Sequence, residues 1–277
     1  MKAPINKIID FSVVDGPGSR TSIFFQKCNI HCLYCHNPET QNLCTNCGLC
    51  VKSCKQKALK LIDSKVVWDS NLCINCDTCI SICPNNASPK IKYLSASEVF
   101  DKIKKNIPFI RGITVSGGEC SLYPSFLEEL FALCKEYNLT CLMDSNGMVS
   151  YSKYPNLMNL VDGVMLDIKA WDNKFYSKLT GYNNEIVKEN LVYLNKLNKI
   201  EELRIVYVPN LVDAKEALIG IKDILKDNIK TVKIKLIKFR NNGVKGALKN
   251  HPNVTNNEIN IIYKYALELG YENIIIR

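Results

Sequence analysis

Three cysteines stand close together near the N-terminus in the pattern C-x3-C-x2-C: Cys28, Cys32 and Cys35. They directly follow an apolar run, residues 21–25, whose composition is typical of a strand. A four-iron, four-sulfur cluster needs a ligand on every iron, and this segment supplies three. An open coordination position distinguishes a reactive metal site from a structural one, so the pattern indicates a reactive cluster. A zinc knuckle or a cysteine-rich turn is the alternative for these residues alone.

Eight further cysteines form two similar groups within residues 41–92, each with the spacing C-x2-C-x2-C-x3-C. This duplication is typical of bacterial two-cluster ferredoxins, in which the fourth cysteine of each half ligates the other half's cluster. Pro84 follows the second group as expected, whereas Lys55 takes the proline position after the first. A pair of zinc ribbons is the alternative. The pattern predicts one closed cluster on Cys44, Cys47, Cys50 and Cys83 and another on Cys54, Cys73, Cys76 and Cys79.

The composition is that of a globular protein, with 47% hydrophobic and 23% charged residues among 277. No apolar run approaches the length of a membrane span, and residues 1–13 lack a signal-peptide pattern, so we expect a cytoplasmic protein. Such cysteine-rich chemistry also suggests an anaerobic setting, because thiolates and clusters are oxidised readily. The remaining cysteines, Cys120, Cys134 and Cys141, lie in apolar contexts and are expected to be inert core thiols.

The formal net charge of +9 raises the question of nucleic-acid binding. Eleven thiolates around three clusters would lower this charge to roughly +4. The lysines are spread along the chain, and no basic segment is interleaved with aromatic residues. We therefore expect no nucleic-acid partner and read the charge as a solvated face, or a weak docking surface for an acidic partner.

Strand-like and helix-like segments alternate outside residues 41–92, which predicts a parallel sheet. The expected strands are 21–26, 112–115, 140–144, 163–169, 203–208 and 232–239, and the expected helices include 125–137, 185–197, 215–225 and 257–269. About six β/α units are fewer than the eight of a closed barrel. The prediction is an α/β frame, residues 1–40 and 93–277, with residues 41–92 inserted as a small ferredoxin-like α+β domain.

Residues suited to ligand binding follow these strands, at the end where barrels place their chemistry. Two adjacent glycines let a ligand approach the backbone. Carboxylates at neighbouring strand tips repel each other unless a cation lies between them, although a simple Asp–Lys ion pair at the rim is the alternative. The candidates are Gly117, Gly118, Glu119, Asp144, Ser145, Met165, Asp167, Ile168, Lys169, Arg204 and Arg240.

Several motifs together resemble the radical S-adenosylmethionine (SAM) superfamily, and within it the glycyl-radical-enzyme activating enzymes. They are Asp15-Gly16-Pro17-Gly18-Ser19-Arg20, the cysteine loop with its Cys35-His36-Asn37-Pro38 ending, and the blocks SGGE at 116–119, DSNG at 144–147 and LDIK at 166–169. The segments 65–68 and 76–79 of the insert look most like the YjjW-type subgroup. The resemblance implies a partial, laterally open (β/α)6 TIM-type barrel.

The resemblance also implies roles for the candidate residues. The cluster on Cys28, Cys32 and Cys35 would bind SAM at its open iron and cleave it reductively. Tyr34 and His36 would border the adenine, and Gly117, Gly118 and Glu119 would hold the methionyl amine. Asp144, Ser145, Asp167 and the Met165 carbonyl would bind a monovalent cation, Na or K. Next to Ile168, Lys169 would pair with the SAM carboxylate, with Arg204 and Arg240 as further anion-binding candidates.

The implied activity is installation of a glycyl radical on a separate glycyl radical enzyme, with reduced flavodoxin or ferredoxin as electron donor. We expect three 4Fe-4S clusters, one SAM-coordinating and two ferredoxin-type, in a monomer that does not enter a membrane. Three other interpretations stay open: a radical SAM enzyme acting on a small molecule or nucleic acid, a non-catalytic electron-transfer protein, and a zinc-binding nucleic-acid module.

Overall fold

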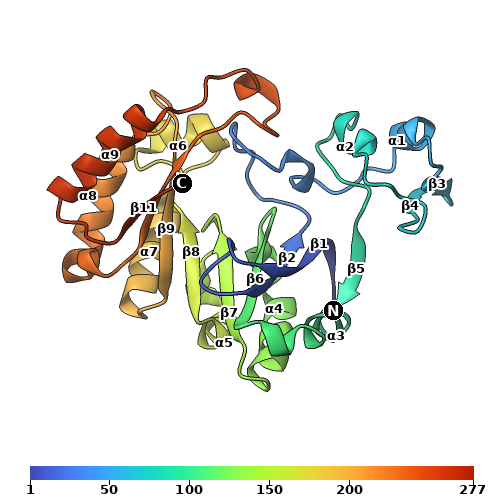
Figure 1. The fold of residues 1–277 in the computed structure, drawn as a ribbon, viewed down its shortest axis with the longest axis horizontal. Coiled ribbons are helices and arrows are strands. Elements are labelled where there is room, and N and C mark those ends of the chain that lie inside the picture. The colour runs from blue at the N-terminus through green and yellow to red at the C-terminus, as the bar shows by residue number, and fades with distance from the viewer.

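The main element of the molecule is one open sheet of nine strands, as the computed structural model of residues 1–277 shows (Figure 1). Across the sheet the strand order is β11-β10-β9-β8-β7-β6-β2-β1-β5. The edge strands β11 and β5 do not pair with each other, so the sheet does not close. The strands are β1 Lys2–Ser12, β2 Arg20–Phe25, β5 Lys92–Ser95, β6 Gly112–Gly117, β7 Thr140–Ser145, β8 Gly163–Asp167, β9 Ile200–Tyr207, β10 Ile234–Lys238 and β11 Ile274–Ile276.

The body of the sheet is parallel, as the alternating pattern predicted. Strands β2 and β6 to β11 pair in parallel, whereas β1 pairs antiparallel with both β2 and β5. All six predicted strands are confirmed. The sequence analysis missed β1, β5 and β11, which lie at or next to the edges of the sheet. A mixed α/β fold with an open, mainly parallel sheet is consistent with a partial TIM-type barrel.

Helices connect the strands and lie along the outside of the curved sheet (Figure 1). They are α3 Ala96–Lys104, α4 Pro124–Lys135, α5 Pro155–Leu160, α6 Asn173–Thr180, α7 Glu185–Lys196, α8 Ala214–Leu225 and α9 Asn256–Glu268. The four predicted helices are confirmed as α4, α7, α8 and α9. Ser95 and Glu98 form a capping box that starts α3 directly after β5, a signal the sequence analysis overlooked. None of the helices has both the length and the apolar character needed to cross a bilayer.

The segment 15–20 fastens the edge of the sheet where the parallel strands begin. Arg20 is 1% exposed, and its guanidinium donates to Thr114 Oγ1 at 2.9 Å and to the carbonyls of Ile113 at 2.7 Å and Thr140 at 2.9 Å. These bonds join the starts of β2, β6 and β7. In barrel folds, residues at the edge where the strands begin contribute to stability. The cysteine loop leaves β2 at the opposite edge, where the strands end.

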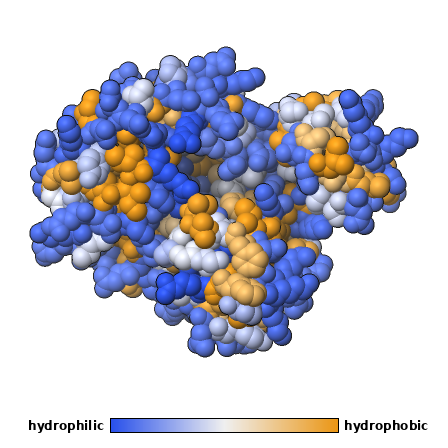
Figure 2. All heavy atoms as spheres, in the orientation of Figure 1, coloured by the Kyte–Doolittle hydropathy of each residue, from blue (hydrophilic) through white to orange (hydrophobic).

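Most of the residues between the cysteine loop and β5 form a separate small unit. It contains its own two-stranded antiparallel sheet, β3 Leu59–Ile62 with β4 Lys65–Trp68, and two short helices, α1 Leu49–Ser53 and α2 Thr78–Ser81. Figure 2 shows this unit as a lobe divided from the larger body by a hollow. Backbone and side-chain bonds of Asn42 to Asn86 and Asn85 close the base of the lobe.

Candidate active site

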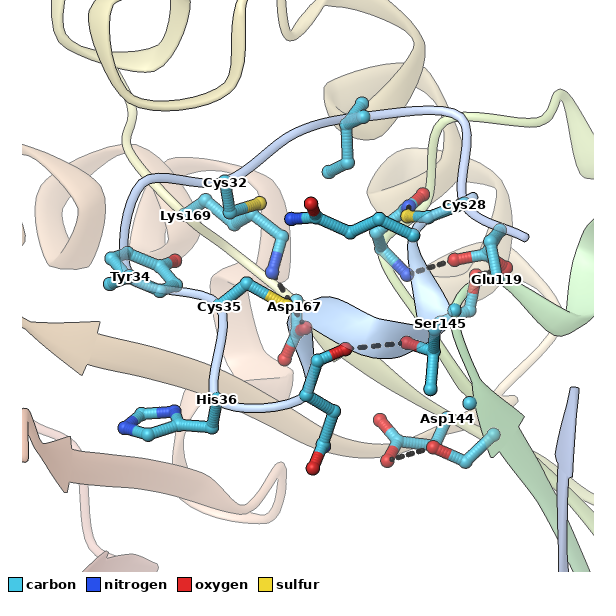
Figure 3. A pocket seen from close by; sticks show the side chains of 18 of the residues that line it. Cys28, Cys32, Tyr34, Cys35, His36, Glu119, Asp144, Ser145, Asp167 and Lys169 are labelled. Carbon is cyan, nitrogen blue, oxygen red and sulfur yellow. Dashed lines mark hydrogen bonds and ion pairs between the residues drawn. The ribbon is translucent and has the colours of Figure 1, made fainter. Parts of the chain in front are cut away.

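The cysteine loop leaves the end of β2 and is held in place by backbone hydrogen bonds. The N–H of Lys27 donates to the Thr40 carbonyl at 2.8 Å, and the N–H of Cys28 donates to the Gln41 carbonyl at 2.9 Å. The middle of the loop is fixed on α6, because the Leu33 N–H donates to the Leu179 carbonyl at 2.9 Å. The loop therefore arches over the strand ends of the sheet and encloses a cavity of about 280 Å³ (Figure 3).

This cavity collects most of the residues expected from the sequence. The expected residues that line it are Cys28, Cys32, Tyr34, Cys35, His36, Gly117, Gly118, Glu119, Asp144, Ser145, Asp167, Lys169 and Arg204. They come from the cysteine loop and from the ends of β6, β7, β8 and β9, which the parallel register brings to one edge. The structure thus brings these residues together in one cavity.

Three expected residues do not reach this cavity. Ile168 is buried in the hydrophobic core, and Met165 lies deeper along β8, where its sulfur accepts from Arg204 Nη2 at 3.0 Å. Arg240 has an exposed side chain outside the cavity. Its carbonyl is bonded to His36 Nε2 at 2.7 Å. Arg240 therefore contributes by holding the end of the cysteine loop through its backbone.

The three thiols of the loop are partly buried. Burial raises the pKa of Cys28 to about 12 and that of Cys32 to about 11, and it also raises the pKa of Cys35. Metal ligation requires thiolates, so loading iron here releases protons. Three thiols on one loop, facing a common cavity with no fourth cysteine in its wall, form a donor set that fits a 4Fe-4S cluster with one open iron.

Close packing requires the glycines at the end of β6, where Gly117 faces the last residue of β2 and Gly118 faces the start of the cysteine loop. Gly117 has a φ of +116°, and a Cβ there would meet the backbone N of Phe25 at 2.2 Å. A Cβ on Gly118 would meet the Lys27 carbonyl oxygen at 2.2 Å. We predicted that these glycines admit a ligand, and the structure adds that they admit the protein's own backbone, which fixes the loop over the strand ends.

Glu119 is buried, and its hydrogen bonds connect the segment after β6 to the end of β7. Its side chain is 1% exposed and accepts from four N–H and O–H donors: the N–H and hydroxyl of Ser121, the hydroxyl of Ser145 and the N–H of Asn146. The Cys120 thiol is a fifth donor, 3.9 Å from Oε1. Burial raises the pKa of Glu119 while these hydrogen bonds oppose the shift. The hydroxyl of Ser145 also accepts from the phenol of Tyr151 at 2.7 Å, so its bonds are made within the protein.

The two carboxylates at neighbouring strand tips each hold a side-chain cation. Arg204 Nη1 lies 2.7 Å from Asp144 Oδ1, and Lys169 Nζ lies 2.9 Å from Asp167 Oδ2. Although burial opposes it, the Asp167 carboxylate raises the pKa of Lys169 well above its usual value, so the ammonium stays charged. The Asp–Lys ion pair considered as the alternative is therefore present, and a second pair, through Arg204, compensates Asp144.

Asn146 and Gln41 also line the cavity, and the sequence analysis did not single them out. Asn146 Nδ2 lies 3.6 Å from the sulfur of Cys28 and donates to Asn29 Oδ1 at 2.8 Å. Its place in the DSNG block could have identified it. Gln41 is 8% exposed and accepts from Asn86 of the small lobe at 3.4 Å. Gln41 follows the cysteine loop but belongs to no sequence motif that could have identified it.

The eight cysteines of the small lobe line two further cavities, and the fourth cysteine of each half crosses to the other. One cavity is lined by Cys54 together with Cys73, Cys76 and Cys79, and the other by Cys44, Cys47 and Cys50 together with Cys83 and Cys79. Trp68 lines the first of these, and its buried indole N–H has no protein acceptor. The sulfur of a cluster would supply one, so the residues fit the two expected groups.

Comparison with known proteins places the chain in a family. The model of the radical SAM superfamily matches residues 22–219. A protein of Haemophilus influenzae described as a putative glycyl-radical enzyme activating enzyme is 29% identical over 98% of this chain and 95% of its own. The trans-4-hydroxy-L-proline dehydratase activating enzyme of Clostridioides difficile is 33% identical over 70% of each chain. In fold, QueE of Escherichia coli is similar with a TM-score of 0.54, at 11% identity over 100% of this chain and 94% of that one.

The matched region contains the cysteine loop, β6 to β9 and every strand-end residue that lines the active-site cavity. Family membership and the arrangement of the cavity therefore agree. This chain belongs to the radical SAM superfamily and, within it, to the glycyl-radical-enzyme activating enzymes.

Proposed function

We propose that this protein cleaves SAM reductively and uses the resulting radical to take a Cα hydrogen from a glycine of a partner glycyl radical enzyme. The observation that carries the proposal is the single cavity shared by three loop thiols and two carboxylate–cation pairs. Relatives named as activating enzymes of different glycyl radical enzymes support the class of partner but not its identity.

Cys28, Cys32 and Cys35 would hold the 4Fe-4S cluster. Bound there, this group would supply one electron to the sulfonium of SAM, which would then split into methionine and a 5'-deoxyadenosyl radical. Asn146 directs its amide at the sulfur of Cys28 and so fixes one ligand. Hydrogen bonds to cluster sulfurs tune the reduction potential, which gives this amide an electronic as well as a positional role.

The charged side chains of the cavity are suited to the zwitterionic methionyl end of SAM. Lys169 lines the same cavity as Cys32 and would bind the carboxylate. The cavity also contains the backbone of Gly117 and Gly118, which would hold the amine. A monovalent cation at Asp144, Ser145, Asp167 and the Met165 carbonyl stays a prediction, and Arg204 would compete with it for Asp144.

The partner's glycine must come within contact of the radical, and proximity is the main contribution the protein makes to this step. Glycine suits the reaction, because no side chain obstructs its Cα and the flanking amides delocalise the radical. A sheet that does not close would offer a lateral entry for a loop of the partner. We expect that loop to leave its place in the partner and become ordered on binding, at a cost in affinity.

The small lobe would bind two more 4Fe-4S clusters, with residues 41–92 as a ferredoxin-like domain of the YjjW type. The crossed lining of its two cavities supports this assignment. Four-cysteine sites are closed, so they are suited to carrying electrons from a reduced flavodoxin or ferredoxin rather than to binding substrate. We expect the protein to work as a monomer in the cytoplasm.

A Cys32→Ala variant tests the assignment of the active cluster. We expect 5'-deoxyadenosine formation to be lost and iron content to fall from about 12 to about 8 atoms per chain, while the paramagnetic resonance signals of the lobe persist. The matched control is Cys134→Ala, which removes a buried cysteine outside all three groups and should keep every cluster. Continued cleavage of SAM by the Cys32 variant would show that the reactive cluster lies elsewhere.

The partner is tested by incubating the reduced enzyme with SAM and a candidate glycyl radical enzyme. A glycine-centred doublet in the paramagnetic resonance spectrum is the expected result. Cleavage of SAM without that doublet for any partner would favour a small-molecule substrate. No cleavage at all by the fully loaded enzyme would favour an electron-transfer protein.

A further inference from the structure

A second cavity, of about 460 Å³, lies against β1 on the side away from β2. It is bounded by β1, β5, the end of α3 and Trp68 of the small lobe, and it shares no residue with the active-site cavity. Four lysines line it: Lys7 of β1, Lys92 of β5, and Lys102 and Lys105 at the end of α3. The lysines that appeared scattered in the sequence are therefore partly gathered here by the edge of the sheet.

The four lysines are exposed, and none forms an ion pair. The one acidic residue of the lining, Asp10, accepts a hydrogen bond from Asn106 at 3.2 Å. Neighbouring lysines behave differently, since Lys2 pairs with Glu98 and Lys90 with Asp77. A concave surface with four unpaired positive charges and one negative charge concentrates positive potential and attracts anionic partners.

Trp68 connects this surface to the cysteines of the small lobe. Its side chain lines the lysine cavity and also lines the cavity of Cys54, Cys73, Cys76 and Cys79. The ammonium of Lys92 lies 5.5 Å from the centre of the indole ring, within range of a cation–π interaction. A single aromatic side chain thus separates the positive surface from a set of four thiols.

We propose that the lysine-lined cavity is the docking site of an acidic one-electron carrier protein, and that electrons enter the chain through the cysteine set behind Trp68. In each transfer the carrier is oxidised by one electron and the iron–sulfur group held by Cys54, Cys73, Cys76 and Cys79 is reduced by one. No atoms are exchanged. The inference rests on the proposed function, because cleavage of each SAM consumes one electron.

Position favours an electron carrier over the glycyl radical enzyme as the occupant. The partner glycine must reach the active-site cavity, which opens at the strand ends, whereas the lysine cavity lies at the β1–β5 edge. A carrier needs only to approach one redox group closely. Binding through exposed lysines also suits an encounter that forms quickly and dissociates after each electron.

The test uses the anaerobic, cluster-loaded enzyme with a Lys102→Glu/Lys105→Glu double substitution. The probe is photoreduced flavodoxin, an acidic carrier, and stopped-flow absorbance follows reduction of the enzyme's clusters. We expect the second-order rate constant of the variant to fall about tenfold or more at low salt. The wild-type rate should fall as salt is added and the variant rate should change little, because screening acts on the lost charges.

The matched control is Lys222→Glu/Lys264→Glu, which reverses two exposed lysines on α8 and α9 far along the sheet order from β1. It should keep the wild-type rate and salt dependence. Both variants should be reduced fully by dithionite and then cleave SAM, and this arm tests the proposed function separately. Unchanged rate and salt dependence in the Lys102/Lys105 variant would overturn the docking site. So would weakened binding of the glycyl radical enzyme together with normal reduction by flavodoxin.

Discussion

Replacing Glu119 by Gln should destabilise the protein although the side chain keeps its shape. The carboxylate faces four N–H and O–H donors: three at Oε1, from Ser121 and Ser145, and the Asn146 N–H at Oε2, 2.8 Å away. The Cys120 thiol adds a weaker donor at Oε1. A glutamine amide can offer an oxygen at only one of these positions. Its NH2 group must therefore face at least one buried N–H, and the reverse orientation would place it against three donors.

The size of the effect follows from the bond that is lost. A hydrogen bond to a charged group contributes about 1.5–3 kcal/mol, and a buried donor left without a partner costs a comparable amount. We expect a loss of about 3 kcal/mol in the free energy of unfolding, which for a chain of this size lowers the melting temperature by about 5–10 °C. Differential scanning fluorimetry under anaerobic conditions measures the shift.

The result also decides the charge of the buried group. Burial raises the pKa of Glu119. If the carboxyl were protonated at neutral pH, replacing it by glutamine would change the melting temperature little. The N–H and O–H donors around the side chain favour the ionised form. The control Glu136→Gln, at an exposed position after α4, should shift the melting temperature by no more than about 2 °C. A similarly small shift for Glu119→Gln would refute the reasoning.

Three further outcomes are expected. Arg204→Met leaves the Asp144 carboxylate without its cation and should cost about 3 kcal/mol in chemical denaturation, and a loss below about 1 kcal/mol would contradict a stabilising pair. Gly220→Ala places a Cβ 1.9 Å from the Trp171 ring and should lower the free energy of unfolding by about 1–3 kcal/mol, unlike a change on the open side of α8. Cys83→Ser should remove the paramagnetic resonance signal of the cluster on Cys44, Cys47 and Cys50 and spare the other lobe cluster; the opposite pattern would disprove the crossed ligand sets.

The parts of the site that could be predicted are those determined by residues close together in the sequence. Cysteine spacing defines a loop or a pair of crossed halves, because ligands of one cluster must lie within a few residues or repeat in register. Strand-end residues such as Glu119 and Asp167 could be predicted because parallel strands bring their ends to one edge. The structure confirms that these residues share a wall, and their chemical roles stay predictions.

Other features depend on contacts between distant segments, which no local pattern records. Arg204 was expected as an anion ligand, yet the register of β9 beside β8 places it opposite Asp167 and within 2.7 Å of Asp144. The strands β1 and β5 were missed because each is stabilised by its neighbour in the sheet rather than by its own composition. The lysine cavity arises at the same place, where these two strands meet α3 and the lobe.

The two ion pairs of the active-site cavity explain how its carboxylates can stay ionised and fixed in position without a ligand. Two unpaired carboxylates at adjacent strand tips would repel each other and push their side chains apart. With Arg204 on Asp144 and Lys169 on Asp167, each carboxylate is held at a defined position before a ligand arrives. A zwitterionic ligand can exchange partners with a pair by giving its ammonium to the carboxylate and its carboxylate to the cation. Such an exchange conserves the number of ion pairs, so these contacts set the orientation of the ligand, while most of its affinity must come from the cluster and from the walls of the cavity.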